Sequence, residues 1–533
     1  MNEINFIQDD AYITLRYVQN FINGNGLVFN LGERVEGYTN FLWVMILSLF
    51  GVTAEIFSLQ IDLALVSQIL SQLSGIALLI LSFYFTKKLL ITKFLIKYND
   101  DYLITSLLSL IPPLLISFSS SFLYWGVSGM ESTLFTFLTL LSIYRYLFRN
   151  DDKPDAIFIA ASILNSLLRP EGFLIFLLIV IHSKIYSSKF FNAIDKSDKK
   201  QISIHTKEII YYIIPLIAFL LFRFLYYGYL LPNTFYAKTG FNLEHFKRGV
   251  DYVLSAISNN FFYGILLNIP LINFRKSVLR SATVFFYFFV LTYLIFIVLI
   301  GGDVLPVDRF ILPLLPLVLI FSMTIIFHLF DLNVSLSKKL FLFFALAITL
   351  SFFVITSFIS NYDIMRTKRS YEVGLVEKMK FYAEWVKNKQ IENAGDKKIT
   401  VALSTIGAFS FFSEARVIDL VGLTDEYIAH NPKEVPGIDE ELPVLWKERR
   451  YNAEYVLKQN PDYLIFPAGA KPTAFAECAI FVQPEFYKNY YVQLIYSEQL
   501  KQLLPIFTKR ENILHDYTGD CNVRFVKPYI EAN

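Results

Sequence analysis

The chain contains 533 residues, of which 55% are hydrophobic and 18% are charged, and its mean hydropathy is +0.47. This composition is too apolar for a soluble globular protein of this length and predicts an integral membrane protein. The formal net charge of +2, without a basic run interleaved with aromatic residues, argues against nucleic acid as a partner.

The first segment is polar and carries two adjacent carboxylates. Asp9 and Asp10 lie in QDDAYITLRY, and GNGLVFNLGERVEGYTNFLW follows closely. The stretch 41–52 is apolar but shorter than the ~20 residues that a bilayer requires. We interpret it as a helix that lies in the membrane interface.

Eight longer apolar stretches are each near the length of a membrane span. Two shorter pieces, 155–168 and 172–183, flank the tetrapeptide RPEG and predict a broken hairpin. Together they predict about ten crossings. The eight longer stretches are 63–86, 102–121, 131–148, 209–226, 250–270, 282–300, 311–330 and 340–359.

Basic residues fall in alternate loops, which sets the orientation by the positive-inside rule. We expect these loops to be cytoplasmic and the polar motifs between the other spans to lie on the outer face. Counting 41–52 as a span would place the first basic loop outside and invert every later loop. The basic loops contain Lys87, Lys88, Lys93 and Lys97; Arg149 and Lys153; the run 184–207; Arg275, Lys276 and Arg280; and Lys338 and Lys339.

Only eight residues precede the acidic pair, which this orientation places outside. A short polar segment can be translocated behind a reverse-oriented first span, or the start can lie upstream so that another span precedes Met1. We expect the second, which would raise the number of crossings to about eleven.

From about residue 361 the composition becomes that of a soluble domain. YEVGLVEKMKFYAEWVKN has apolar residues on one helical face, and KITVAL, ARVIDLVG and DYLIFP are typical of buried strands. We therefore expect an external active-site loop with interfacial helices at 1–62, a transmembrane domain at 63–360 and an extracytoplasmic α/β domain at 361–533. Cys478 and Cys521 both lie in the last domain, so we expect a disulfide there, with two unpaired thiols as the alternative.

The acidic pair is the candidate catalytic base. Sugar transfer from a lipid phosphate requires a base for the acceptor hydroxyl, cations for the departing phosphate and a site that excludes water. A neighbouring carboxylate and partial burial raise the pKa of a carboxyl group toward the useful range. Alternatively, Asp10 caps a helix at 11–22, so we favour Asp9 slightly as the base.

The same segment offers groups that suit a sugar phosphate. Arg16 and Arg34 are suited to bidentate phosphate contacts. Glu36, Tyr38 and Asn40 are further candidates for substrate binding, and Tyr and Asn suit sugar hydroxyls. The alternative is an interfacial helix with ordinary aromatic and cationic anchors.

Two later motifs add polar groups that we expect on the outer face. In LLPNTFYAKTG, Asn233 and Lys238 are candidates for the donor phosphate. In GGDVLPVDRF, Asp303, Asp308 and Arg309 lie between two spans, where polar groups are commonly functional, although the last two could simply pair with one another.

Other polar residues in these motifs have structural explanations at least as good as functional ones. For Glu131 in SGMES, and for Arg169 and Glu171 in RPEG, we expect an ion pair or a helix start. Asp419 and Asp425 follow a predicted strand, where they could hold acceptor sugar or serve equally well in caps and turns.

The segment DDAYITLRYVQNFINGNGLVFNLGERVEGYTNFLW resembles the first external loop of bacterial GT-C polytopic glycosyltransferases. The resemblance is particularly to the terminal arabinofuranosyltransferases of actinobacterial cell walls. SGMES, LRPEG, LLPNTFYAK, GGDVLPVDRF and VIDLVGLTD also resemble that family in the same order, so the similarity extends over nearly the whole chain.

This resemblance implies a polytopic α-helical protein of the bacterial inner membrane, here without the first span of the family, and with a C-terminal extracytoplasmic α/β domain. It implies transfer of a sugar, with a pentofuranose as one option, from a polyprenyl-phosphate donor to a cell-envelope glycan or lipid-linked acceptor. Asp9 and Asp10 would correspond to the acidic pair from which the base is drawn. Some GT-C enzymes hold a divalent metal and others do not, so a metal stays open and no ligand for it is assigned.

Two other functions compete with the transferase. A lipid or glycan transporter or flippase should show related repeats and charged residues within its spans. A noncatalytic GT-C-like envelope protein should have lost the acidic pair. The spans are nearly free of charge and the pair is present, which favours the enzyme.

The orientation can be tested by cysteine-accessibility labelling of whole cells. Because Ser404 belongs to the predicted outer domain and Ser197 to a basic loop, a cysteine at position 404 should react with an impermeant reagent and one at position 197 should not. Labelling of both positions from the same side would show that the orientation is wrong.

Overall fold

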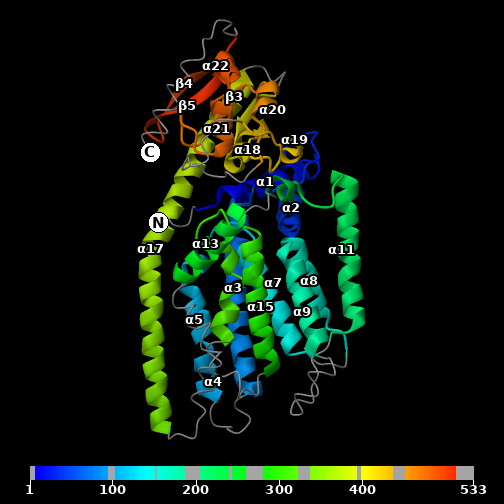
Figure 1. Ribbon diagram of the computed structural model, residues 1–533, viewed down its shortest axis with the longest axis vertical. Helices are drawn as coiled ribbons and strands as arrows, with labels where there is room; N and C mark the ends of the chain where they lie inside the picture. Colours follow the sequence, from blue (N-terminus) through cyan, green and yellow to red (C-terminus); the bar gives the residue numbers. More distant parts are fainter. Residues whose placement is uncertain are drawn as a thin grey trace. The chain divides into compact units, whose positions relative to one another are not determined.

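The computed structural model describes residues 6–93, 102–149, 153–186, 204–238, 243–259, 280–321, 336–392, 398–435 and 450–511 (Figure 1). The chain divides into two compact units. The helical unit contains Leu65–Phe219 and Phe241–Ser370, and the mixed unit contains Asn5–Ala64, Leu220–Gly240 and Tyr371–Asn533.

The helical unit is built from helices that pack on their sequence neighbours. Helix α7 packs on α8, α8 on α9, and α13 on α15 (Figure 1). The described helices that lie wholly or partly in this unit are α3 Leu63–Lys93, α4 Tyr102–Ser109, α5 Ile111–Ser117, α6 Ser120–Gly126, α7 Ser132–Leu147, α8 Ala156–Leu168, α9 Glu171–Tyr186, α11 Thr206–Tyr227, α13 Leu243–Asn259, α15 Arg280–Leu299, the 3₁₀ turn η1 Arg309–Ile311 and α17 Leu336–Glu392.

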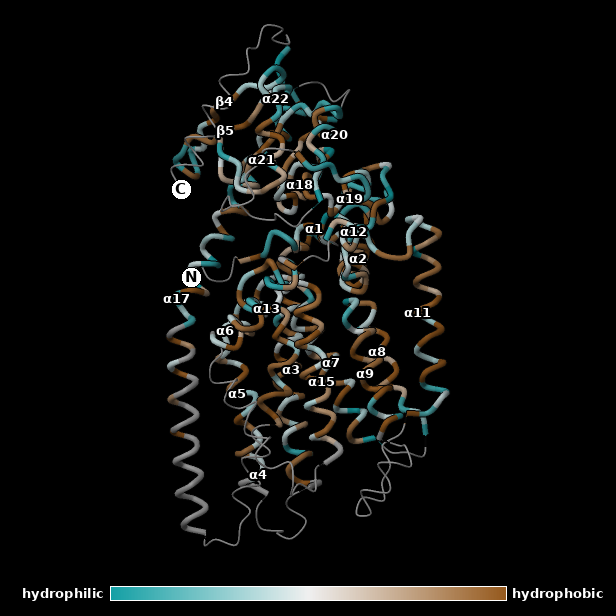
Figure 2. The backbone as a smooth tube through the Cα atoms, viewed as in Figure 1, coloured by the Kyte–Doolittle hydropathy of each residue, from teal (hydrophilic) through white to brown (hydrophobic). Residues whose placement is uncertain are grey.

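Several of these helices are suited to a bilayer. Leu63–Ile91, Thr206–Tyr227 and Ala282–Leu299 are each long and apolar enough to cross it, and the bent pair Thr105–Ser117 and Ser120–Gly126 would serve as a broken span. Helices α11 and α15 are hydrophobic along most of their length (Figure 2). These helices support a multi-pass membrane protein, whereas the predicted count of ten crossings stays a prediction because parts of 250–270 and 311–330 lie outside the described residues.

The break at RPEG has a local cause. Arg169 precedes Pro170, a position that disfavours helical backbone, and its φ and ψ of −153° and 145° are extended. A Cβ at Gly172 would lie 2.4 Å from the backbone carbon of Asn165, so only glycine permits this close approach. The predicted pair of helices flanking RPEG is therefore confirmed as α8 and α9.

The mixed unit joins three stretches that are far apart in sequence. Helix α1, Asp9–Ile22, packs on α2, Phe41–Ile56, and on α18; the short helix α12, Asn233–Lys238, packs on α19. The predicted domain boundaries after residues 62 and 360 separate parts of the chain that we expect inside the membrane from parts that we expect outside it. These boundaries stay predictions. The packing shows that the N-terminal segment shares a unit with the C-terminal sheet.

The sheet of the mixed unit has five strands in the order β2-β1-β3-β5-β4. Strand β1 is parallel to β2 and β3, whereas β5 is antiparallel to β3 and β4. Its elements are β1 Thr400–Leu403, α18 Gly407–Ser413, β2 Arg416–Asp419, α19 Glu426–His430, α20 Ala453–Lys458, β3 Tyr463–Ile465, α21 Phe475–Phe481, α22 Pro484–Asn489, β4 Tyr490–Ser497 and β5 Gln502–Lys509.

The three predicted strands are confirmed as β1, β2 and β3, because each is a short apolar run buried in the core. The core also contains Phe466, Phe481, Phe486 and Phe507. Cys478 is buried in α21, whereas Cys521 lies outside the described residues, so the disulfide stays a prediction.

The contact between α1 and α18 depends on a glycine. A Cβ at Gly407 would lie only 1.9 Å from the backbone oxygen of Asp9. Gly407→Ala should therefore force the two helices apart and destabilise the protein by about 1–3 kcal/mol, as overpacking does. Thermal unfolding of the purified protein in detergent would measure this loss.

Gly374 provides the matched control, because it lies in α17 with no atom within 4 Å of an added Cβ. Gly374→Ala should stabilise the protein by about 0.5–1 kcal/mol through the better helix propensity of alanine. Equal melting temperatures for Gly407→Ala and the parent chain would contradict the close approach.

Candidate active site

The acidic pair lies at the start of α1, where its two members have different surroundings. The helix begins at Asp9, one residue after the N-cap Gln8, so Asp10 is not the cap that one alternative assigned to it. The buried carboxylate of Asp9 instead accepts the backbone N–H groups of Gly407 at 3.0 Å and Ala408 at 2.8 Å. Asp9 thus caps the first turn of α18, a helix about 400 residues further along the chain.

A third carboxyl group completes this contact. The buried Glu372 of α17 accepts the backbone N–H of Asp9 at 2.9 Å. Burial raises the pKa of Glu372 to about 8, with smaller contributions from the charges of Asp9 and Asp10. Burial likewise raises the pKa of Asp9 to about 7, although the N–H groups of Ala408 and Gly407 oppose the rise.

Asp10 is more accessible than Asp9. It is only partly buried, and no hydrogen bond or ion pair to its side chain is found in the described ranges. Since the Asp9 carboxylate is occupied by two backbone donors, Asp10 is the member of the pair that remains available to a substrate. The preference for Asp9, based on the expected capping role of Asp10, therefore loses its basis.

Arg16 is directed into the protein. Its guanidinium donates to the backbone oxygens of Phe29 at 3.2 Å and Glu414 at 3.3 Å, and to the side chain of Gln19 at 3.1 Å. The side chain is buried, so these contacts tie the loop after α1 to the end of α18. This geometry supports a structural role rather than the predicted phosphate contact.

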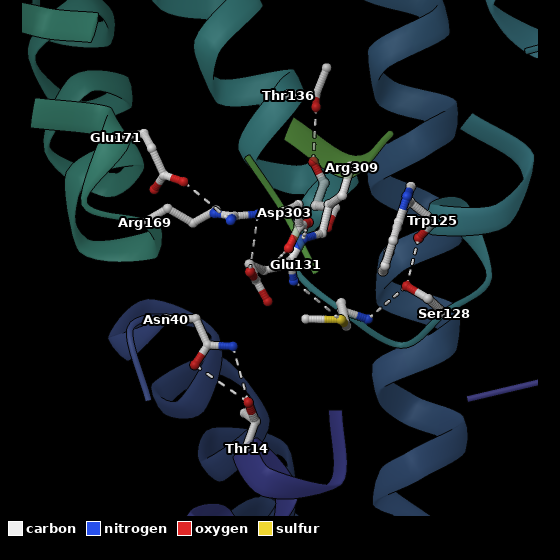
Figure 3. Close-up of polar contacts among 12 residues, drawn as sticks. Thr14, Asn40, Trp125, Ser128, Glu131, Thr136, Arg169, Glu171, Asp303 and Arg309 are labelled. Carbon is white, nitrogen blue, oxygen red and sulfur yellow. Dashed lines mark hydrogen bonds and ion pairs between the residues drawn. The ribbon is translucent and has the colours of Figure 1, made fainter. Parts of the chain in front are cut away.

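Tyr38 and Asn40 are also engaged within the mixed unit. The hydroxyl of Tyr38 lies 3.0 Å from that of Tyr227. The Asn40 amide donates to the Thr14 hydroxyl at 3.0 Å (Figure 3). Both side chains are buried, so in this conformation they shape the site rather than project into it.

Glu36 forms a buried ion pair with Arg223 near the end of α11, with 2.7 Å between Oε2 and Nε. Burial raises the pKa of Glu36 to about 7, and the charge of Arg223 opposes the rise. Sequence reasoning missed Arg223, although an arginine in the otherwise apolar run 209–226 was a signal for a buried partner.

Asn233 connects the same region to the C-terminal part of the chain. Its backbone N–H donates to the Glu36 carbonyl at 2.9 Å, and its amide donates to the carbonyls of Gly422, Leu423 and Asp425 at 2.8–3.2 Å. A side chain predicted to bind phosphate thus binds backbone. Lys238, at the end of α12, is exposed and stays a candidate.

A small pocket opens beside these contacts. Arg34 at its edge is exposed and lies over the Tyr226 ring, 4.8 Å from the centroid. The pocket is lined by Arg34, Val35, Glu36, Tyr227, Tyr229, Leu231, Asn233 and Glu426.

The two carboxylates near β2 have local roles. Asp419 is fully buried and accepts the backbone N–H groups of Val421 at 3.0 Å and Thr424 at 2.9 Å. Asp425 caps α19 by accepting the N–H of Ile428 at 3.0 Å. Of the two explanations left open by the sequence, the geometry supports caps and turns.

The helical unit contains a separate charged cluster, formed by Glu131, Arg169, Glu171, Asp303 and Arg309 (Figure 3). Arg309 binds Asp303 through two hydrogen bonds of 2.7 and 3.0 Å. The carboxylate that binds Arg309 in this bidentate manner is thus Asp303, six residues away, whereas the alternative offered by the sequence was the neighbouring Asp308.

Arg169 binds more loosely than Arg309. Its nitrogens lie 3.2 Å from Glu171 and 3.6 Å from Glu131, and its Nε has no hydrogen-bond partner within the described ranges. The Phe310 ring lies 5.3 Å from the guanidinium carbon of Arg169 and 5.3 Å from that of Arg309. The ion pair expected for SGMES and RPEG is therefore present, and it belongs to a larger cluster than expected.

The loop beside this cluster is strained. Val307 and Asp308 have φ values of 59° and 49°, a region that a β-branched residue rarely adopts. Ser121 and Trp125 both donate to the Val307 carbonyl, at 2.7 and 2.9 Å, and hold the loop in this shape. Such strain is a common property of functional loops.

The predicted site residues are divided between the units. Asp303, Asp308 and Arg309 belong to the helical unit, and the others belong to the mixed unit. Among the residues that the structure describes, no three His, Cys, Asp or Glu side chains form a set suited to a metal ion. We therefore assign no chemical step to a metal.

Comparison with known proteins yields one domain match and two short alignments. Residues 366–512 match a family described as Domain of unknown function (DUF8728). The chain is 46% identical over 50 residues to the terminal beta-(1->2)-arabinofuranosyltransferase of Corynebacterium glutamicum, covering 9% of this chain and 7% of that protein. It is 41% identical over 76 residues to the enzyme of the same name from Mycobacterium tuberculosis, covering 14% and 12%. The chain thus aligns with only a small part of either relative.

The fold as a whole is similar to ArnT from Cupriavidus metallidurans, a GT-C glycosyltransferase. The match to the crystal structure of ArnT bound to undecaprenyl phosphate covers 95% of this chain and 94% of the ArnT chain. Its TM-score is 0.56 and the sequence identity is 10%. The apo state of ArnT matches with a TM-score of 0.54 and the same identity and coverage. The GT-C fold predicted from the sequence is confirmed.

The raised pKa values of Asp9 and Glu372 predict a pH-dependent stability. Both groups bind protons more tightly in the folded state than in the unfolded chain. Their contribution is therefore fully present below about pH 4 and is lost as the pH rises through about 7 to 8. Glu372→Gln should reduce the loss by up to about 1.4 kcal/mol per pH unit in that window.

Thermal unfolding between pH 5 and 8.5 would measure this slope. Glu384→Gln is the control, because Glu384 lies in the same helix and its side chain is 56% exposed. Identical slopes for Glu372→Gln and Glu384→Gln would show that Glu372 does not titrate as expected.

Proposed function

We propose that this protein is a membrane glycosyltransferase that moves a sugar from a polyprenyl-phosphate donor to a cell-envelope glycan or lipid-linked acceptor. The observation that carries the proposal is the similarity to ArnT over 95% of the chain, since that structure was solved with undecaprenyl phosphate bound. The alignments with two arabinofuranosyltransferases support a pentofuranose as the sugar. We infer an inner-membrane protein whose mixed unit lies on the extracytoplasmic side.

The reaction forms a bond between the acceptor oxygen and the anomeric carbon and breaks the bond between that carbon and the phosphate oxygen. The acceptor proton passes to a carboxylate, and the polyprenyl phosphate leaves with the bonding electron pair. A base contributes by removing the proton as the acceptor attacks, and cations contribute by stabilising the charge that grows on the phosphate.

Asp10 is our candidate for the base. It is the accessible member of the acidic pair, while Asp9 holds the first turn of α18. The Asp9 contact fixes the start of α1 and therefore the backbone on which Asp10 is mounted. Asp9 is thus a positioning residue in this proposal.

Lys238 and Arg309 are the candidate cations for the donor phosphate. Lys238 is exposed. Arg309 is paired with Asp303 through Nε and Nη2, and its Nη1 lies 3.9 Å from the Met130 sulfur. Arg309 would therefore present its Nη1 edge to a phosphate while Asp303 holds the edge formed by Nε and Nη2.

The base assignment is tested by Asp10→Asn, which keeps the shape of the side chain but removes its basicity. Turnover should fall by roughly 10²–10⁴-fold, the contribution of general-base catalysis, while donor binding is kept. Lys238→Ala should instead weaken both donor binding and turnover, because a cation acts on the phosphate in the ground and transition states. Donor binding and turnover are measured for each variant in nanodiscs with a panel of polyprenyl-phosphate sugars.

Asp9→Asn is the comparison that separates the two carboxylates. Asparagine keeps one acceptor oxygen for the α18 cap, so this variant should lose stability while retaining most of its turnover. Near-normal transfer by Asp10→Asn would show that Asp10 is not the base. Loss of transfer in a fully folded Asp9→Asn, together with near-normal transfer by Asp10→Asn, would move the base to Asp9.

A further inference from the structure

The pocket beside Arg34 continues into a group of aromatic rings at the surface of the mixed unit. Tyr229, which lines the pocket, stacks on His430 with 4.7 Å between centroids and 21° between planes. Tyr236 lies 4.4 Å from the same His430 ring. His430 is exposed and the two tyrosines are partly exposed, so the rings are accessible from solvent.

Polar groups surround these rings. The Tyr229 hydroxyl donates to Glu426 Oε1 at 2.8 Å, which fixes both side chains at the rim. Arg34 lies on the rim as well, and Glu36, which is paired with the buried Arg223, lines the pocket. The site therefore offers flat apolar faces and fixed hydrogen-bonding groups within one small concavity.

The pocket carries charges of both signs. Its lining contains Arg34 together with Glu36 and Glu426, and Glu36 is paired with Arg223. A phosphate would meet the exposed carboxylate of Glu426, which opposes the attraction of Arg34. The mixed charges favour a neutral ligand over an anionic one.

We infer that this pocket, with its Tyr229–His430 platform, is a subsite for one neutral sugar residue of the acceptor glycan. A sugar ring has C–H groups that pack on an aromatic face and hydroxyl groups that bind carboxylate, guanidinium and phenol groups. The assignment of the bound sugar to the acceptor rests on the proposed function. The binding of a sugar at this site rests on the pocket alone.

Direct binding tests the subsite without requiring transfer. The full chain in nanodiscs is titrated into fluorescent tetrasaccharides of arabinofuranose, galactofuranose, mannose and glucose, and binding is followed by anisotropy. At least one tetrasaccharide should bind, and Tyr229→Ala and His430→Ala should each weaken its binding about tenfold. Glu426→Gln should weaken it less, because the amide still accepts one hydrogen bond.

Tyr496→Ala is the matched control, because Tyr496 is a 58% exposed tyrosine on β4 that does not line the pocket. It should bind as the parent chain does. Absence of binding to every tetrasaccharide, or equal affinities for Tyr229→Ala and Tyr496→Ala with both variants folded, would overturn the inference. Displacement of a bound tetrasaccharide by dodecyl phosphate, strengthened by Glu426→Gln, would also overturn it in favour of a phosphate site.

Asp10→Asn separates this inference from the proposed function. If the pocket is a sugar subsite and Asp10 the base, this variant binds the tetrasaccharide normally but does not extend it. Normal sugar binding by a parent chain that transfers nothing from any donor would refute the transferase and leave the sugar subsite standing.

Discussion

The mixed unit depends on the capping of α18 by Asp9. Two backbone N–H groups at the start of a helix would be unsatisfied in this buried position, and the Asp9 carboxylate accepts both. The approach is close because Gly407 has no side chain, and Glu372 accepts the backbone N–H of Asp9. One residue thus joins α1, α17 and α18, three helices from distant parts of the sequence.

This contact explains how the two carboxylates of the acidic pair can have different roles. A capping contact is worth only about 1 kcal/mol, but its geometry fixes the direction of the first turn of α1. Asp10, one residue further along the helix, cannot share those donors and stays accessible. Two adjacent carboxylates can therefore serve two purposes, one as a fixed support and one as a candidate reactant.

Buried ion pairs order the rest of the candidate site. Glu36–Arg223 holds the loop after α1 against the end of α11, and Asn233 joins that loop to the backbone near α19. In the helical unit, Arg309–Asp303 and the looser contacts of Arg169 organise the loop around Val307. Burying such charges is unfavourable unless they are paired, so these contacts specify one arrangement of each loop more than they add stability.

The sequence by itself determined the membrane class, the helices flanking RPEG and the first three strands, because apolar length, Pro170 and short buried runs are local signals. The GT-C fold was implied by the resemblance of its motifs to that family, and the similarity to ArnT confirms it. Sequence reasoning missed β4 and β5, since YYVQLIYS exposes apolar side chains such as Leu494 and lacks the polar alternation of a half-buried strand. It also listed Arg16, Tyr38, Asn40 and Asn233 as substrate contacts, whereas each is buried and bonded to protein. Only the tertiary structure decided this, because an arginine or asparagine has the same donors for a backbone carbonyl as for a substrate, and its surroundings come from segments hundreds of residues away.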